Sequence, residues 1–189
     1  MAGQTLRSPQ EAEQIRAQWI AQAQAVRERM AMPGRTDPAE LAAGTGLAFL
    51  ERIMRGELPG IPMGEHMGLV PVEAEPGRIV FQGIPDSRFY NPIGSVHGGY
   101  LATLLDSAVG CAVHTTLAQG MGYTTLELKV NYLRGLTDQV GPVRGEGRVV
   151  SVSRQIGVAE GSVVDAAGRL YAHATTTCLI FPLPAGRTG

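Results

Sequence analysis

The segment Tyr90 to Thr116 decides the fold, and it reads YNPIGSVHGGYLATLLDSAVGCAVHTT. Turn-forming residues lead into the glycine pair Gly98-Gly99. Behind this pair, apolar residues recur at helical spacing, namely Leu101, Leu104, Leu105, Ala108, Ala112 and Val113. The pattern predicts a largely buried helix that begins at the glycine pair.

Asp106 lies in the middle of this predicted helix. It is the only Asp, Glu, Lys or Arg between Arg88 and Glu127. A buried carboxylate is costly unless a partner or a function compensates for it, and burial makes a carboxylate more basic. Two interpretations remain open at this point: a structural Asp that bonds a neighbouring donor, or a working acid–base group.

The start of the predicted helix offers a second candidate group. Gly98 and Gly99 carry no Cβ, so a ligand can approach backbone amides that a helix start leaves unpaired. Such amides can bind an oxyanion. The glycines lie roughly 10–12 Å along the helix from Asp106, which is too far for both groups to act on one carbonyl. If both act together, one of them comes from a second subunit.

These residues carry a resemblance to a known family. The set Asn91, His97-Gly98-Gly99 and Asp106-Ser107-Ala108, with the later strand TTLELKVNYLR at 124–134, resembles the PaaI-type branch of hotdog-fold acyl-CoA thioesterases. The resemblance covers about Met63 to Pro182. It implies hydrolysis of an acyl-CoA thioester to free acid and CoA, with no cofactor and no metal.

The resemblance also implies roles for individual residues. Asp106 would act as general base on water or as nucleophile on the thioester carbonyl, and both options stay open. The N–H of Gly98 or Gly99 on the partner helix would bind the oxyanion. Asn91 and His97 would position the water or the carbonyl group.

The predicted strand after the helix supplies Thr125, which matches a position where related enzymes carry Ser near the catalytic carboxylate. Alternation places Leu126, Leu128, Val130 and Tyr132 on one face of this strand, with Thr125 on the other. Thr125 can donate to a carboxylate or orient a water. It can equally be a Thr chosen for its β propensity.

Residues for the acyl group and for CoA are named with alternatives. Tyr100, Leu104 and Met121 can line an aryl or medium-chain pocket, although such apolar residues also fit a plain core. The resemblance favours aryl or phenylacetyl thioesters, followed by medium-chain acyl-CoA. Arg134 is the main candidate for a CoA phosphate contact, and further candidates are Arg144, Arg148 and Arg154.

Composition limits the other functions. The chain has 189 residues with 44% hydrophobic content, which suits one domain with an appendage. A net charge of −1 without a basic cluster argues against nucleic acid and anionic lipid as partners. Cys111 and Cys178 fit reduced thiols and have no metal-ligand spacing, and His66, His114 and His173 lie outside any motif. No signal peptide or membrane span is recognised, so a cytoplasmic protein is expected.

The first sixty residues are predicted to form a helical extension, residues 1–60, before a hotdog domain at 61–189. Ser8, Pro9 and Glu11 indicate a capped helix start, and the helix should end near Met32-Pro33-Gly34. Its apolar stripe includes Trp19 and needs a surface, either on this chain or on a second subunit. A shorter helix is expected from Thr45 to Arg55.

From Met67 onward the hydrophobic period changes to two. The expected strands are 67–74, 78–84, 123–133, 141–153, 155–165 and 170–181. Short connections between long strands indicate an antiparallel sheet. The predicted fold class is therefore α+β, with a curved six-stranded antiparallel sheet wrapped around one central helix.

Rival functions and the assembly complete the prediction. A non-catalytic acyl-CoA-binding hotdog protein would not need Asp106, and a hotdog dehydratase or isomerase would pair its carboxylate with a His in a different motif. A structural oligomerisation module is the third alternative. Because the candidate groups lie too far apart on one helix, a homodimer is the minimal active unit expected. The resemblance suggests a homotetramer built from two dimers.

Overall fold

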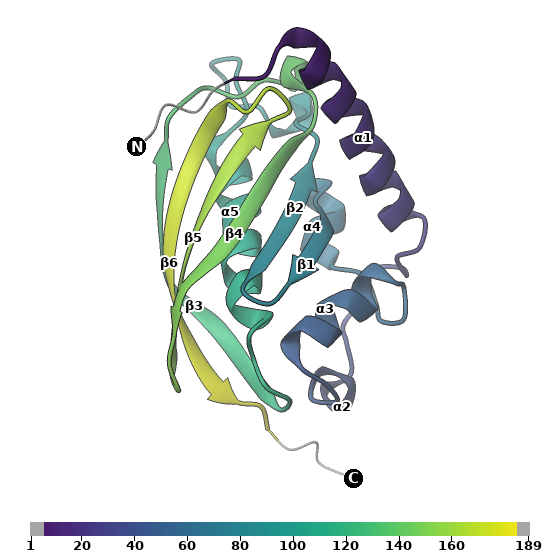
Figure 1. Cartoon of the computed structure of the whole chain (residues 1–189), viewed down its shortest axis with the longest axis vertical. Helices are drawn as coiled ribbons and strands as arrows, with labels where there is room; N and C mark the ends of the chain where they lie inside the picture. Colours follow the sequence, from purple (N-terminus) through teal and green to yellow (C-terminus); the bar gives the residue numbers. More distant parts are fainter. Residues whose placement is uncertain (1–5, 185–189) are drawn as a thin grey trace.

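A six-stranded antiparallel sheet forms the body of the protein (Figure 1). The computed structural model describes residues 6–184. The strands lie in the order β1-β2-β4-β5-β6-β3. Their bounds are Val70–Glu75 (β1), Arg78–Gly83 (β2), Met121–Tyr132 (β3), Val143–Val152 (β4), Ile156–Asp165 (β5) and Leu170–Pro182 (β6). The predicted hotdog arrangement is confirmed, with strand ends that differ by at most three residues from the expected ones.

Helix α5, Gly98–His114, lies inside the curve of the sheet (Figure 1). Leu104, Leu105 and Ala108 are completely buried in the main apolar cluster. Glycines in the facing strands allow this close packing. A Cβ on Gly147 would lie 2.1 Å from the carbonyl oxygen of Ala108, and one on Gly157 would lie 2.5 Å from Val113. The missing side chains of β4 and β5 therefore set the distance between helix and sheet.

The first strand begins later than expected because a short helix precedes it. Helix α4, Pro62–Met67, starts with Pro at its first turn and ends at Gly68, whose φ of 65° is left-handed. β1 therefore starts at Val70 and not at Met67. The short helix α2, Pro38–Leu41, and the 3-10 turns η1, Ser87–Phe89, and η2, Asp138–Val140, complete the elements.

Helix α1, Pro9–Arg27, packs on the outer face of the sheet over β1 and β2 (Figure 1). Its capping box of Ser8 and Glu11 is present as predicted. Ala23 and Val26 pack with valines of β1 and β2. The apolar stripe of this arm thus covers the chain's own sheet, which decides between the two surfaces considered above. Helix α3, Gly46–Met54, is capped by Thr45 and buries Leu50 and Ile53.

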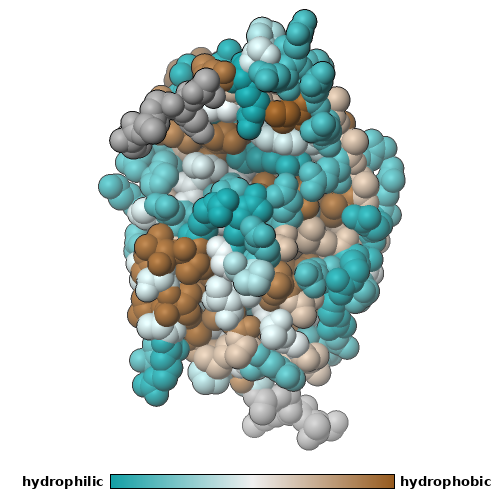
Figure 2. Space-filling view, viewed as in Figure 1, coloured by the Kyte–Doolittle hydropathy of each residue, from teal (hydrophilic) through white to brown (hydrophobic). Residues whose placement is uncertain are grey.

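Apolar side chains are exposed at one end of the sheet, where β4 turns into β5. In Figure 2, hydrophobic side chains gather at the lower left, over the end where β4 turns into β5. Val150, Val152 and Ile156 are exposed there. Among the described residues, no helix is long and apolar enough to cross a membrane.

Candidate active site

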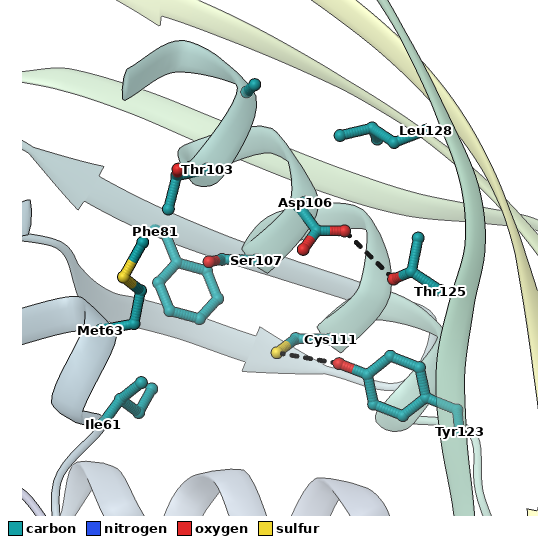
Figure 3. A pocket seen from close by; sticks show the side chains of 11 residues that line it. Ile61, Met63, Phe81, Thr103, Asp106, Ser107, Cys111, Tyr123, Thr125 and Leu128 are labelled. Atoms are coloured by element: carbon teal, nitrogen blue, oxygen red, sulfur yellow. Dashed lines mark hydrogen bonds between the residues drawn. The ribbon is translucent and has the colours of Figure 1, made fainter. Parts of the chain in front are cut away.

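Asp106 lies on the face of α5 that points away from the buried core. Its Oδ1 accepts a hydrogen bond of 3.1 Å from Oγ1 of Thr125 on β3 (Figure 3). The side chain is exposed within the chain, so the expectation of a buried carboxylate is wrong for the isolated subunit. The neighbours of Asp106 in the sequence are apolar, which suggested burial. The helix, however, directs the Asp106 side chain to the side that the sheet leaves open.

A β-bulge in β3 explains why Thr125 reaches this carboxylate. The register with β6 shifts between Thr125 and Glu127, so Leu126 is an extra residue in the strand. Thr125 and Leu128 therefore lie on the same inner face, and Leu126 is 56% exposed. The strict alternation that placed Thr125 opposite Leu128 is wrong for this reason, because one inserted residue reverses the parity of the strand.

A cavity of about 610 Å³ opens beside Asp106 (Figure 3). One side of it is apolar and is formed by Ile61, which precedes α4, by Met63 from α4 and by Phe81 from β2. The helix contributes Thr103 and Ser107, and β3 contributes Tyr123, Thr125 and Leu128. A pocket of this size, largely apolar with a few polar groups, has the properties of a small-molecule site.

Cys111 and Tyr123 form the deep polar contact of this cavity. The thiol Sγ lies 3.7 Å from the Tyr123 hydroxyl (Figure 3). Desolvation raises the pKa of Cys111 to about 11, and the contact with Tyr123 opposes this shift only in part. Cys111 is therefore a neutral thiol near pH 7 and is a poor nucleophile. Asp106 is the carboxylate that lines the cavity.

The helix start distinguishes the two candidate oxyanion donors. The N–H of Gly99 donates to Nδ1 of His97 at 2.9 Å, so the imidazole caps the helix. Within residues 6–184, the N–H of Gly98 has no hydrogen-bond partner. Because Nδ1 accepts, a neutral His97 carries its proton on Nε2. The free backbone donor is therefore Gly98.

Gly98 lines a separate cavity of about 350 Å³ together with Tyr132, Leu133 and Arg134. A Cβ on Gly98 would lie 3.1 Å from the Tyr132 ring, so the glycine permits this close contact. The cavity shares no lining residue with the one beside Asp106. One chain thus presents the carboxylate and the free amide on two different surfaces.

The other predicted site residues lie in several environments. Asn91 stabilises its own loop: its Oδ1 accepts from the N–H of Ile93 at 3.1 Å and its Nδ2 donates to Ser95 at 3.3 Å. Tyr100 and Leu104 are buried in the core and do not line the cavity beside Asp106. Met121 packs against the apolar cluster around Val109. Tyr100, Leu104 and Met121 therefore fit the alternative in which they are core residues.

The arginines also differ in environment. Arg134 is exposed and borders the Gly98 cavity. Arg144 lies below α1, where its guanidinium carbon is 4.5 Å from the Trp19 ring centroid and its Nη1 donates to Glu73 at 3.0 Å. Arg148 pairs with Glu146. The prediction that Arg144 contacts a phosphate fails because the side chain is already engaged in attaching the arm to the sheet.

Several cavity residues were not predicted from the sequence. Thr103, Ser107 and Cys111 follow each other at intervals of four residues, so helix periodicity could have identified this row beside Asp106. Met63 and Phe81 come from distant elements and carry no local signal. Among the described residues, no group of three or more His, Cys, Asp or Glu side chains is arranged to hold a metal ion.

The curved antiparallel sheet, the enclosed helix and the carboxylate on the open side of that helix define a protein of the hotdog class. Residues 93–172 match the family profile of the thioesterase superfamily. The chain belongs to this superfamily, and the predicted relationship to PaaI-type hotdog thioesterases is confirmed.

Individual relatives agree with this assignment. The proofreading thioesterase EntH of Klebsiella pneumoniae is 30% identical over 57% of this chain and 77% of that protein. A candidate esterase of Halobacterium salinarum is 41% identical over 43% of this chain, and the match spans 54% of that protein. The crystal structure of a phenylacetic acid degradation-related protein from Ralstonia eutropha has a TM-score of 0.64 and 30% identity over 69% of this chain and 98% of that chain.

Proposed function

We propose that this protein is a thioesterase that hydrolyses acyl-CoA thioesters with an aryl or medium-chain acyl group. The observation that carries the proposal is the Asp106 carboxylate, exposed on the side of a large apolar cavity and oriented by Thr125. Membership of the thioesterase superfamily supports this reaction. Neither a pure binding protein nor a structural module requires an oriented carboxylate at this position.

Two chemical routes use this carboxylate. In the first, Asp106 removes a proton from a water molecule, and the water oxygen attacks the thioester carbonyl carbon. In the second, an Asp106 oxygen attacks the carbonyl carbon and forms an anhydride, which water then hydrolyses. In both routes the C–S bond breaks, CoA leaves as a thiolate that takes up a proton, and the N–H of Gly98 stabilises the oxyanion.

The separation of the two groups requires a second subunit in this proposal. Gly98 and Asp106 are eight residues apart on α5, a rise of about 12 Å. A two-fold dimer with antiparallel helices would bring Gly98 of one subunit to Asp106 of the other and create two equivalent sites. Strand β3 lies at the edge of the sheet and offers its unpaired backbone groups for such an association. Pairing of dimers into a tetramer is part of the same proposal.

The activity is tested by following thiol release from a panel of acyl-CoAs with Ellman's reagent. The wild type should release CoA, and Asp106→Asn should not. Glu127→Gln is the matched control because Glu127 is an exposed acid on the same strand as Thr125, two residues away. Tight binding of acyl-CoA without any turnover by the wild type would contradict the proposal.

The two routes are separated by a single turnover in H₂¹⁸O. Label in the Asp106 carboxylate after one turnover indicates the anhydride. Label in the product acid alone excludes water attack on the Asp106 carbon of an anhydride and supports the general-base route.

The shared site is tested with Gly98→Pro, which removes the free N–H. Proline is well tolerated at the first position of a helix, and His97 already has ψ of 137°, which suits a residue before proline. Gly98→Ala adds a Cβ but keeps the N–H, so it is the matched control. Mixing Gly98→Pro with Asp106→Asn should restore one intact site per heterodimer. Heterodimers that form, as seen by native mass spectrometry, but remain inactive would exclude the shared site.

A further inference from the structure

Helix α4 contributes to the Asp106 cavity, although it lies outside residues 93–172, which match the family profile. Ile61, the residue before the helix, and Met63, in its first turn, line one side of the cavity, and the β3 residues line the other (Figure 3). Met63 is 52% exposed, so its long and flexible side chain lies at the rim and not in the packed core. A change of its position changes the space left for a ligand.

Helix α4 is too short to be stable by itself. It has six residues, and its N-cap residue makes no side-chain hydrogen bond. Isolated helices of this length are unstable in water, so contacts with other elements determine where α4 lies.

Ile61 and Met67 pack against the main core, and the N-terminal extension adds hydrogen bonds at both ends of α4. Before the helix, the N–H of Gly60 donates to the carbonyl oxygen of Met32, and the N–H of Gly34 donates to that of Gly60, each at 3.1 Å. After the helix, Nη2 of Arg27 donates to the carbonyl oxygen of Gly68 at 2.6 Å. We call these contacts the α4 clamp.

The extension is in turn attached to the sheet. Nε2 of Gln22 donates to the carbonyl oxygen of Val72 at 3.0 Å, and Trp19 stacks on Arg144. A Cβ on Gly60 would lie 2.7 Å from the carbonyl oxygen of Ala31, so the two segments are in direct contact. The position of Met63 is therefore linked through the clamp to the outer face of the sheet.

The charge of the residues that line the Asp106 cavity indicates which acyl groups can bind there. Among the described residues that form the cavity, Asp106 is the only charged side chain, and no Lys or Arg is present. An acyl group with a second carboxylate would be desolvated there without a counter-ion. The surfaces of Ile61, Met63 and Phe81 instead suit an uncharged alkyl or aryl group.

We propose that the N-terminal extension is a specificity element: through the α4 clamp it places Met63 in the cavity and thereby sets the largest uncharged acyl group that is hydrolysed. This inference rests on the proposed thioesterase function. It assigns a role in substrate selection to residues that lie outside the profile match at 93–172. It also makes Met63 the residue that limits the size of the acyl group.

The test compares kcat/KM for butanoyl-, octanoyl-, dodecanoyl-, phenylacetyl- and succinyl-CoA. Met63→Ala should raise the dodecanoyl to butanoyl ratio by about tenfold or more, since one methylene of misfit in an apolar pocket changes kcat/KM by about tenfold or more. Met63→Leu, which conserves volume, should keep the wild-type profile. Succinyl-CoA should be the poorest substrate of every variant.

The clamp is tested with Arg27→Ala, and Arg29→Ala is the matched control because Arg29 is exposed on the same arm and makes no side-chain hydrogen bond within residues 6–184. Arg27→Ala should shift the profile in the direction of Met63→Ala, by a smaller factor, with circular dichroism unchanged. A shift in Met63→Ala alone would overturn the role of the extension. An unchanged profile in Met63→Ala, with an active wild type, would overturn the whole inference. A wild type that hydrolyses none of the thioesters would remove the proposed function, and this inference with it.

Discussion

Asp106 and His114 are two polar side chains on the same helix, eight residues apart, and their environments are opposite. Asp106 is exposed, accepts a hydrogen bond from Thr125 and lines the large cavity. His114 is 7% exposed, and neither ring nitrogen has a hydrogen-bond partner within the described residues. Its ring packs edge-on against Phe49 at 5.5 Å and next to Tyr123 at 5.3 Å.

The comparison separates an exposed candidate catalytic residue from a residue that is packed in the core. A carboxylate at the open side of the helix costs little stability and remains accessible to substrate and water. A buried imidazole without partners fills space between α3, α5 and β3, but its polar nitrogens reduce stability. In this protein, burial identifies the structural residue, and exposure beside a cavity identifies the candidate catalytic one.

The largest effect is expected for Asp106→Asn. Loss of the acid–base group should lower kcat by about 10²- to 10⁴-fold. The free energy of unfolding should change by less than about 0.5 kcal/mol, because the side chain is exposed. Thiol release and urea denaturation measure the two quantities. A large loss of stability would show that Asp106 is a structural residue.

The second-largest effect is expected in the pH dependence of stability, and His114 should cause it. Burial lowers the pKa of His114 to about 4, from an ordinary value near 6.5. The unfolded chain therefore binds a proton at higher pH than the folded one. The stability provided by the neutral ring is complete above about pH 6.5 and falls by up to about 3 kcal/mol as the pH decreases to 4.

Urea denaturation between pH 7 and pH 4 measures this loss in the wild type and in His114→Leu. The variant should lose less stability across this range, because it lacks the buried titrating group. Carboxylates titrate in both proteins, so the difference between the two curves isolates His114. Parallel curves would show that His114 is protonated without cost in the folded state.

At pH 7, His114→Leu should increase the free energy of unfolding by about 1 kcal/mol. Removal of two unsatisfied buried nitrogens is favourable, and the loss of aromatic contacts with Phe49 and Tyr123 offsets part of the gain. His66→Leu serves as the control, since His66 is exposed on α4. A strong destabilisation by His114→Leu would indicate that the imidazole has a polar partner, such as a buried water.

The smallest effect is expected for Thr125→Val, which removes the donor to Asp106 but keeps a β-branched side chain. The kcat should fall by about tenfold, equivalent to one hydrogen bond of about 1.4 kcal/mol. Thr125→Ser should retain most of the activity, because it keeps the hydroxyl. Full activity of Thr125→Val would assign this residue to strand propensity alone.

Much of the fold could be predicted from local patterns. The apolar spacing behind Gly98-Gly99 predicted α5, the capping residue Ser8 predicted the start of α1, and the expected helix from Thr45 to Arg55 corresponds to α3. Helix α4 was missed, because six residues that include Gly64 provide too short a periodic signal. The division of the chain at residues 60 and 61 stays a prediction.

The candidate site was predictable only in part. The glycine pair, His97 and Asp106 follow one another along the chain, so the motif named them together. Thr125 was named, but its orientation depends on the bulge at Leu126, which alternation cannot foresee. Met63 of α4 and Phe81 of β2 line the cavity without having been predicted. Tyr100 was predicted to line a pocket but is buried in the core.

The sequence by itself therefore determined the hotdog sheet around one helix and the identity of its isolated carboxylate, because periodicity, caps and charge are properties of neighbouring residues. The exposure of Asp106, the N–H of Gly98 that has no partner within residues 6–184, and the contacts between the arm and α4 became visible only in the folded chain. These features depend on contacts between segments far apart in the chain, such as Arg27 with Gly68 and Thr125 with Asp106. Their free energies arise only when the sheet has curved around the helix and brought those segments together.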